Sequence, residues 1–219
     1  MDRTGVWRAV RRPESAAVAG LVFAVLLTVV ILELRSVASD PESWRTWYGD
    51  VGARDSVGLA LALVPFAGIA FLWFIAVVRS QVGRADDRFI ETVFLGSGLL
   101  FVATLFTTAA TLTGVLRLGA VMPVSDETAA TAMAFGSALL GQFGTRMAAV
   151  FTLTLTTAAR LSGRLPGWLV VLGYAVGLLL LLSPPLPTLT QFAFPVWVAV
   201  LSAAVLVRRR AAHGDPVDA

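Results

Sequence analysis

Three polar residues that lie within apolar stretches are the first candidates for chemistry in this sequence. Arg146 lies near the middle of a long apolar stretch, residues 125–160, and Gln142 precedes it by one helical turn. Glu33 lies near the end of an earlier apolar stretch. Because a charged side chain at membrane depth needs a partner or a wet cavity, we predict that Arg146 pairs with Glu33. Gln142 is expected to complete this buried polar cluster.

The predicted cluster has two interpretations. In the first, the pair of Arg146 and Glu33 is a structural pin between the first and fourth helices of a bundle. In the second, the cluster is an anion or substrate site, because charges near the membrane midplane mark substrate sites in transporters. Both interpretations fit the sequence.

Most other membrane chemistry lacks the residues that it needs. The sequence has no Cys, its 17 basic residues are all Arg, and its one His, His213, lies in the polar tail. Thiolate metal sites, Schiff-base lysines and intramembrane histidine ligands or proton relays are therefore excluded. The sequence also has no HExxH motif, no Ser-His-Asp set and no phosphate-binding glycine loop. We predict no catalytic residues, no metal and no cofactor, and expect that the protein is not an enzyme.

Composition predicts the elements that would position the polar cluster. The chain has 219 residues, of which 57% are hydrophobic and 14% charged, and its mean hydropathy is +0.81. Soluble domains contain about 45–50% apolar and about 25% charged residues. The sequence therefore predicts an all-α fold, a polytopic membrane helix bundle that forms a single integral membrane domain over residues 1–219.

Six apolar stretches are candidates for transmembrane helices, which need about 20 residues to cross a bilayer. The predicted spans are residues 16–35, 57–78, 89–113, 128–160, 167–183 and 191–207. Pro65 lies inside the second span, where a proline removes a backbone hydrogen bond and should bend the helix.

A short interfacial helix is predicted at about residues 40–50, between the first two spans. Asp40 is suited to cap its start, and Trp44, Trp47 and Tyr48 then fall on one face. Trp and Tyr favour the membrane surface, which supports a helix lying at the interface. An aromatic patch that grips a substrate is the alternative interpretation.

The fourth span is unusually long. Ser125, followed by Asp126 and Glu127, predicts a helix start, and the helix would continue to about Arg160. At 1.5 Å per residue this helix would be about 50 Å long, whereas the hydrocarbon layer is about 30 Å thick. Either the helix extends beyond the membrane, or it breaks near residues 141–144.

One face of the fourth span consists of small residues. At an α-helical period this face contains Ala130, Ala134, Ser137, Gly141, Gly144 and Ala148. In lipid, small residues let helix backbones approach closely. We predict that neighbouring helices pack on this face and that the fourth span is the central helix of the bundle.

The distribution of arginine predicts the orientation. Twelve Arg lie at the N-terminus, in the second and fourth loops and in the tail, whereas four lie in the first and third loops. Because cytoplasmic loops carry the excess of positive charge, both termini are predicted to be cytoplasmic in a bacterial inner (plasma) membrane. The same charges account for the pI of about 10.5, so no nucleic-acid partner is expected.

Three stretches resemble a group of bacterial proteins. They are residues 19–23 (AGLVF), residues 88–93 (RFIETV) and residues 164–169 (RLPGWL). They resemble six-helix integral membrane proteins of the actinobacterial type, a group with no assigned activity. Gly167 departs from the Arg that this group has after the Pro. The resemblance implies six helices and implies no function.

The favoured functional class is a non-enzymatic membrane bundle that binds or stabilises a partner or a lipid. Its expected partners are the lipid bilayer and either a second copy of the chain or another membrane protein. The alternative is a small transporter or channel with a polar site around Arg146.

Overall fold

Every regular element in the described part of the chain is helical, which confirms the predicted all-α class. The computed structural model describes residues 13–38, 50–82, 88–163, 165–183 and 189–213, and the structural statements below concern these residues. In chain order the elements are α2 (Pro13–Ala38), α4 (Val51–Val82), α5 (Arg88–Val121), α6 (Asp126–Ala138), the π-helical turn η1 (Leu139–Gly144), α7 (Thr145–Leu161), α8 (Gly167–Leu182), the 3-10 turn η2 (Leu189–Phe192) and α9 (Ala193–His213). The predicted interfacial helix at about 40–50 falls on residues 39–49, outside the described part.

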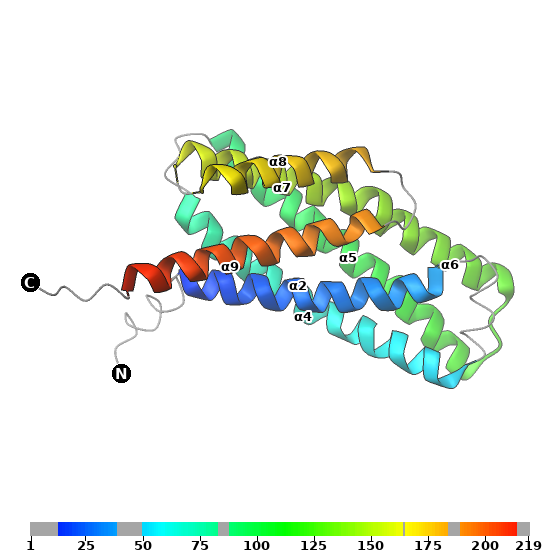
Figure 1. Ribbon diagram of the computed structural model, residues 1–219. Helices are drawn as coiled ribbons and strands as arrows, with labels where there is room; N and C mark the ends of the chain where they lie inside the picture. The colour runs from blue at the N-terminus through cyan, green and yellow to red at the C-terminus, as the bar shows by residue number, and fades with distance from the viewer. Residues whose placement is uncertain (1–12, 39–49, 83–87, 164, 184–188, 214–219) are drawn as a thin grey trace, which may run out of the picture.

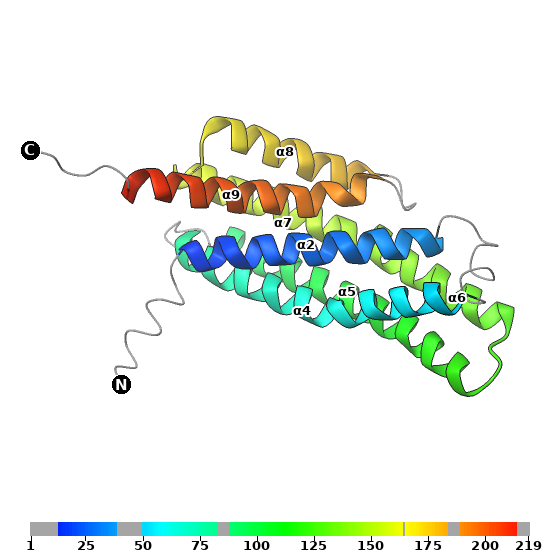
Figure 2. The ribbon, with the colours of Figure 1, turned by 60° about the horizontal axis from the view of Figure 1, so that its bottom comes forward.

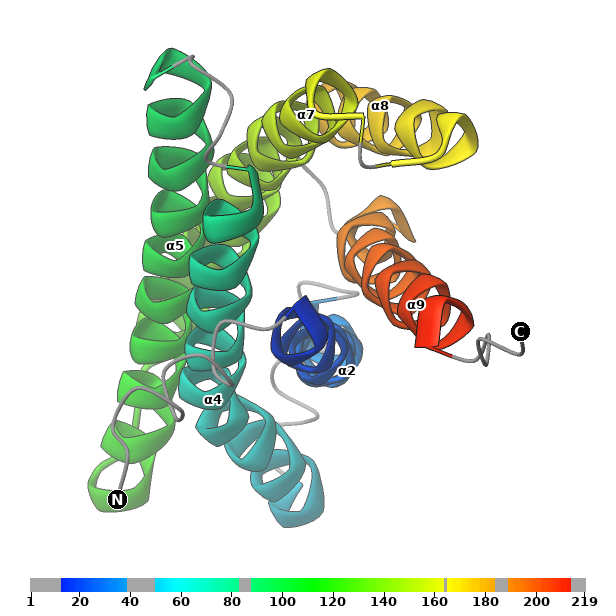
Figure 3. The same ribbon diagram turned by 90° about the vertical axis from the view of Figure 1, so that its left-hand side faces the viewer.

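The helices form a closed ring in chain order (Figure 3). α2 packs against α4, α4 against α5, α5 against α7, α7 against α8, and α9 closes the ring against α8 and α2. The α2–α4 contact is the most extensive and the α8–α9 contact the smallest of the ring. α2 and α9 lie side by side and run in opposite directions (Figure 1).

Five phenylalanines, one from each of five helices, fill the middle of the ring. We call them the central phenylalanine cluster: Phe23 of α2, Phe71 of α4, Phe101 of α5, Phe151 of α7 and Phe194 of α9. All five are buried, and their contacting ring centroids are 4.4 to 6.2 Å apart, in stacked, tilted and edge-to-face arrangements. Aromatic pairs favour these separations because the ring edge and face carry opposite partial charges.

The outside of the ring is as apolar as its inside. On α2 the exposed line consists of Val18, Val22, Val25, Val29 and Leu32, opposite the buried face that carries Phe23. A helix that is apolar all round lies either inside a large protein or in a membrane. Because these faces lie outside the bundle, they fit a lipid environment.

Four helices of the described residues are long and apolar enough to cross a membrane: Ser15–Arg35, Val51–Arg79, Arg88–Val121 and Leu189–Arg208. The structure therefore has several apolar helices of membrane-spanning length, and the number of six spans stays a prediction. α8 is apolar but has only 16 residues, about 24 Å, which is shorter than a hydrocarbon layer of about 30 Å. The helix that contains α6 and α7 is not among the four.

The long fourth helix does not break. The backbone stays right-handed helical where α6 meets η1 and where η1 meets α7, so the three elements form one rod. The rod begins where the sequence predicted, because the Ser125 side chain accepts a hydrogen bond from the Thr128 N–H at 3.3 Å. Together with the end of α5, α6 extends past the ends of α2 and α8 (Figure 2). The helix is therefore continuous through residues 141–144, and its extension beyond the membrane stays a prediction.

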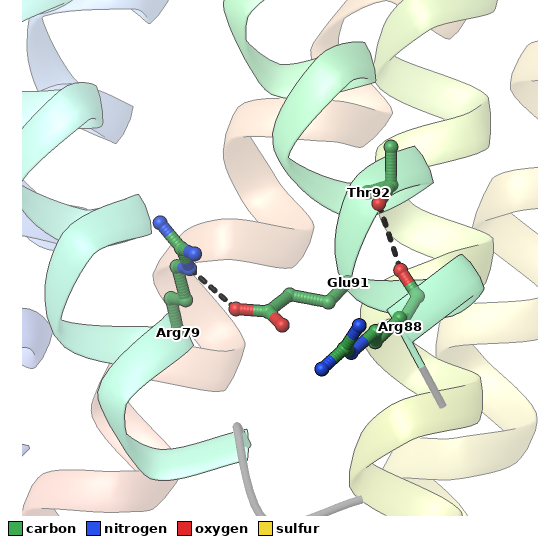
Figure 4. A network of polar contacts seen from close by, with 4 residues as sticks. All are labelled: Arg79, Arg88, Glu91 and Thr92. Carbon is green, nitrogen blue, oxygen red and sulfur yellow. Dashed lines mark hydrogen bonds and ion pairs between the residues drawn. The ribbon is translucent and has the colours of Figure 1, made fainter. Parts of the chain in front are cut away.

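Two features shape the α4–α5 pair. α4, which contains Pro65, changes direction along its length, as a proline in a helix interior leads one to expect (Figure 3). In the last turn of α4, the Nε of Arg79 lies 2.6 Å from the Oε1 of Glu91, which is in the first turn of α5 (Figure 4). Both side chains are partly exposed, and such ion pairs contribute only about 0–1 kcal/mol. Packing, rather than charge, holds these two helices together.

The central phenylalanine cluster predicts the substitution that should be most damaging in α4. Phe71 is fully buried and contacts the four other rings of the cluster, so Phe71→Ala leaves a cavity where five helices meet. Core Phe-to-Ala changes cost about 3–5 kcal/mol, and we expect a loss of this order in detergent unfolding experiments. Phe66→Ala is the matched control, because Phe66 lies on the same helix and is 62% exposed. Equal losses in the two variants would contradict a packed centre at Phe71.

Candidate functional site

The site is built around the π-helical turn η1. The backbone N–H of Thr145 donates to the carbonyl of Leu140, five residues earlier, and the Thr145 hydroxyl donates to the same oxygen at 3.2 Å. A π-helical turn holds one more residue than an α-helical turn, and such turns often occur at functional sites. The apolar and glycine-rich sequence of η1, LLGQFG, contains no strong helix breaker such as proline that would end the rod.

The extra residue changes which face of the rod is packed. Before the turn the packed residues are Ala129, Met133 and Gly136, within it they are Gly141 and Gly144, and after it Ala148 is packed. Two α-helical segments joined by one extra residue no longer share one straight face. The small-residue line predicted from a uniform α-helical period therefore divides at the turn. Its residues Gly141, Gly144 and Ala148 are buried, and its residues Ala130, Ala134 and Ser137 are exposed.

A cavity of about 60 Å³ lies beside the π turn. The end of α2, the second half of α5, α6 with η1, and η2 all contribute to its walls. Most of the lining side chains are apolar, namely Ile31, Leu34, Leu112, Met133 and Leu140. About 10–15 Å³ is enough for one water molecule, so a cavity of this volume has room for a few water molecules or one small group.

A second cavity of about 20 Å³ adjoins the first toward the bundle centre. The two share Ile31, Leu140 and Gln191 as lining residues. The second cavity also contacts Phe101 and Phe194 of the central phenylalanine cluster. The space therefore leads from the end of α2 inward and stops at the aromatic rings.

Four polar side chains line the larger cavity: Arg35, Thr108, Ser137 and Gln191. The guanidinium carbon of Arg35 lies 5.7 Å from the centroid of the Phe192 ring, within the range of a cation–π contact. Gln191 immediately precedes Phe192 in η2. The guanidinium of Arg35 supplies the positive charge of the cavity wall.

The two hydroxyls of the cavity wall already bond to the backbone. Thr108 donates to the carbonyl of Gly136 at 3.3 Å, and this bond joins α5 to α6. Ser137 donates to the carbonyl of Ala134 at 3.0 Å within its own helix. The other two polar side chains of the wall are Arg35 and Gln191, and the amide group of Gln191 can both donate and accept a hydrogen bond.

Three threonines of α5 form hydrogen bonds within their own helix. Thr104, Thr107 and Thr111 each donate to a carbonyl three or four residues earlier in α5. This is the common arrangement for hydroxyls in helices. Thr108 differs because its acceptor lies on α6, next to the π turn.

Arg146 bonds to two backbone carbonyls. Its Nη1 donates to the carbonyl of Gln142 at 3.0 Å, and its Nη2 donates to the carbonyl of Ser183 at 3.2 Å. Ser183 caps the C-terminal end of α8, where the helix dipole favours a cation. Arg146 thus connects the start of α7 to the end of α8.

The structure gives the three residues of the predicted polar cluster different surroundings. Gln142 meets Arg146 through its backbone carbonyl, and its side chain is exposed. Glu33 is half-buried on α2 and, among the described residues, is not a hydrogen-bond partner of Arg146. The expected carboxylate is replaced by a carbonyl at a helix end, and the connection runs from α7 to α8 instead of to α2.

Sequence reasoning missed Arg35 and Gln191 as cavity residues. Arg35 follows the first span directly, so it reads as a charge at a helix end. Gln191 comes eight residues after Ser183, the last described residue before residues 184–188, and its place at the cavity depends on how η2 folds back beside α2. A cluster of three or more metal-ligating side chains is likewise not found among the described residues.

Comparison with known proteins gives no match: no family model, no curated protein and no solved structure is similar to this chain. The resemblance to six-helix bacterial membrane proteins therefore remains an expectation drawn from three short stretches.

The carbonyl bonds of Arg146 predict how its variants behave. Arg146→Gln should lower the free energy of unfolding in mixed micelles by about 1.5–3 kcal/mol, the usual size for hydrogen bonds to a charged group. Gln142→Ala should have little effect, because Arg146 uses only the backbone at that position. Glu33→Gln and Arg146→Gln should add within about 0.5 kcal/mol in the double variant. A coupling well above that value would show that the two side chains meet after all.

Proposed function

We propose that this chain is an integral membrane protein with six spans that binds a lipid-like molecule or a membrane partner and catalyses no reaction. The observation that carries this proposal is the mostly apolar cavity beside η1, inside a ring whose outer surface is also apolar. Apolar cavities with a few polar groups are the usual form of a small-molecule site. The charge of Arg35 and the carboxamide of Gln191 would orient what binds there.

In this proposal the two remaining spans are α8 and the rod of α6, η1 and α7. α8 is short, and a short span is accommodated when the bilayer thins locally. The rod is long, and its α6 part would extend into the aqueous phase, where Asp126 and Glu127 are exposed. The ring order supports this reading, because the rod and α8 pack on each other and together lie between α5 and α9, which are long enough to cross.

The distribution of arginine among the loops supports a proposed orientation of the chain in the membrane. With the start of α2 and the end of α9 in the cytoplasm, the arginine-rich loops lie inside, as in other bacterial inner-membrane proteins. The cavity then lies in the half of the bundle that faces away from the cytoplasm.

A transporter or channel is the class that the sequence left as the alternative. Transport requires a path along the bundle, and in this conformation the central phenylalanine cluster occupies the middle of the ring. The cavity ends on that cluster. This arrangement favours binding over conduction.

The proposed topology can be tested with reporter fusions. Fusions after Asp50, Ala85, Met122, Gly163, Pro187 and Asp215 should report outside, inside, outside, inside, outside and inside. This alternation is expected because arginine is in excess in the second and fourth loops and at both ends of the chain. If Met122 and Gly163 report the same side, the α6–α7 rod does not cross the membrane.

The proposed binding role can be tested on purified protein. Native mass spectrometry from a mild detergent should find a co-purified lipid-sized molecule, whereas proteoliposomes should show no flux of small anions or cations above that of empty liposomes. Proteoliposomes that contain the Phe71→Ala variant test whether the central phenylalanine cluster blocks flux, because that change opens space in the cluster. Substantial flux through the unaltered protein would reject the binding class in favour of transport.

A further inference from the structure

The start of α7 and the end of α8 bring a guanidinium next to the carbonyl end of a helix. We propose that they bind the head group of a phospholipid that carries both a phosphate and a primary ammonium, as phosphatidylethanolamine does. The phosphate lies at Arg146, and the ammonium lies at the last carbonyls of α8. This site is separate from the cavity beside η1. The inference rests on the proposed six-span arrangement, in which α8 crosses the membrane.

The guanidinium of Arg146 has donors that the described residues do not use. Its Nη1 donates to the carbonyl of Gln142 and its Nη2 to that of Ser183, which uses two of the five N–H groups of a guanidinium. Both acceptors are carbonyls, so no carboxylate of the described residues balances this charge. The bond to Gln142 lies at the surface of the bundle and the bond to Ser183 is partly buried. The guanidinium can therefore be reached from outside the bundle.

Two helix lengths place this guanidinium just inside the hydrocarbon layer. α7 and α8 lie side by side and run in opposite directions (Figure 1). At 1.5 Å per residue, Arg146 lies about 21 Å back along α7 from Arg160, and the 16 residues of α8 rise about 24 Å. In a layer about 30 Å thick, both lengths place the contact between Arg146 and Ser183 about 6–9 Å below the boundary on the side away from the cytoplasm. A charge at this depth needs a partner, and lipid head groups come within reach where the bilayer thins around the short α8.

The end of α8 offers an acceptor for a cation. In a continuing helix the carbonyls of Leu180 and Leu181 would accept from residues 184 and 185, but both are prolines and have no N–H. The Ser183 hydroxyl donates to the Leu180 carbonyl at 3.0 Å and replaces one missing donor. A side-chain donor of this kind for the Leu181 carbonyl is not found among the described residues. Because a helix C-terminus carries a partial negative charge, this carbonyl favours a cationic donor.

A phosphate together with a primary ammonium meets both requirements. Phosphate oxygens accept hydrogen bonds from the fork of a guanidinium, and an ammonium can donate three hydrogen bonds to carbonyls. A head group with a phosphate alone would bring its charge to the negative end of α8, which the helix dipole disfavours. A quaternary ammonium has no N–H to donate. Phosphatidylethanolamine therefore fits this place better than phosphatidylglycerol or phosphatidylcholine does.

The rest of such a lipid would lie on the outer surface of the bundle. Phe143 of η1, together with Leu178 and Leu182 in the last turns of α8, is exposed and offers apolar contact to acyl chains. The side chain of Gln142 is also exposed, one helical turn before Arg146, so its carboxamide adds a donor for a phosphate oxygen. The site therefore needs no large internal cavity.

The test is a lipid titration of the delipidated full chain in a mild detergent, read by native mass spectrometry. The probes are phosphatidylethanolamine, its N-methyl and N,N-dimethyl derivatives, phosphatidylcholine and phosphatidylglycerol, all with the same acyl chains. Phosphatidylethanolamine should half-saturate the protein at a concentration about tenfold or more below that of phosphatidylcholine or phosphatidylglycerol, since a hydrogen bond to a charged group is worth about 10- to 100-fold in affinity. The affinity should fall with each added methyl group, because each one removes an N–H.

Two arginine variants test the location. Arg146→Gln should lower the affinity for phosphatidylethanolamine by about tenfold or more, because the phosphate loses the guanidinium. Arg117→Gln should leave the affinity unchanged and is the matched control, since Arg117 is exposed near the end of α5, at the same end of the bundle (Figure 2). If Arg146→Gln does not fold, the methylated series on the unaltered chain still decides the proposal.

The outcomes that overturn the proposal are distinct. Equal affinities for phosphatidylethanolamine and phosphatidylcholine would reject the ammonium contact and with it the proposal. An unchanged affinity in folded Arg146→Gln, or an equal loss in Arg117→Gln, would reject the site at Arg146. Reporter fusions after Gly163 and Pro187 separate these failures from failure of the proposed function. If the two fusions report opposite sides, α8 crosses the membrane and only the lipid site is rejected; if they report the same side, the six-span arrangement is rejected.

Discussion

The contact of five aromatic rings is the constraint on which the rest of the bundle depends. In lipid, a helix gains little by exchanging an apolar neighbour for another, so association depends on close packing. A ring of helices with small residues at every contact would leave an open centre. The central phenylalanine cluster fills that centre. Each of its five side chains contacts the phenylalanines of at least two other helices. α8 contributes no ring to this cluster and instead packs closely on α7, where a Cβ at Gly173 or Gly177 would overlap Thr156 or Leu153.

Inside this apolar interior, backbone carbonyls take the place that carboxylates hold in soluble proteins. Arg146 bonds to the carbonyls of Gln142 and Ser183, and Thr108 bonds to that of Gly136. An acceptor of this kind carries no full charge and needs no desolvation of an anion. It is available wherever a helix ends or its regular bonding changes. The end of α8 and the π turn therefore supply the acceptors that hold Arg146 in this fold.

Much of the fold is predictable because it depends on local patterns. Apolar stretches give the helices, and the capping residue Ser125 gives the start of the rod. The candidate site is less predictable because it depends on departures from those patterns. A uniform helical period placed Ala130, Ala134 and Ser137 on the packed face, but one extra residue in η1 moves them off it. The sequence predicts an acidic partner for Arg146, because it does not reveal which backbone carbonyl a helix end presents to this side chain.

The π turn also gives the faces of the two parts of the rod a fixed angular offset from each other. In an uninterrupted α-helix, the direction in which each residue points is fixed by every residue before it. An extra residue in η1 resets that relation, so the face that α6 turns to α5 is set separately from the face that α7 turns to α8. The part of the rod beyond the ring can therefore acquire a new surface, and hence a new binding partner, while the packing of α7 in the ring is kept.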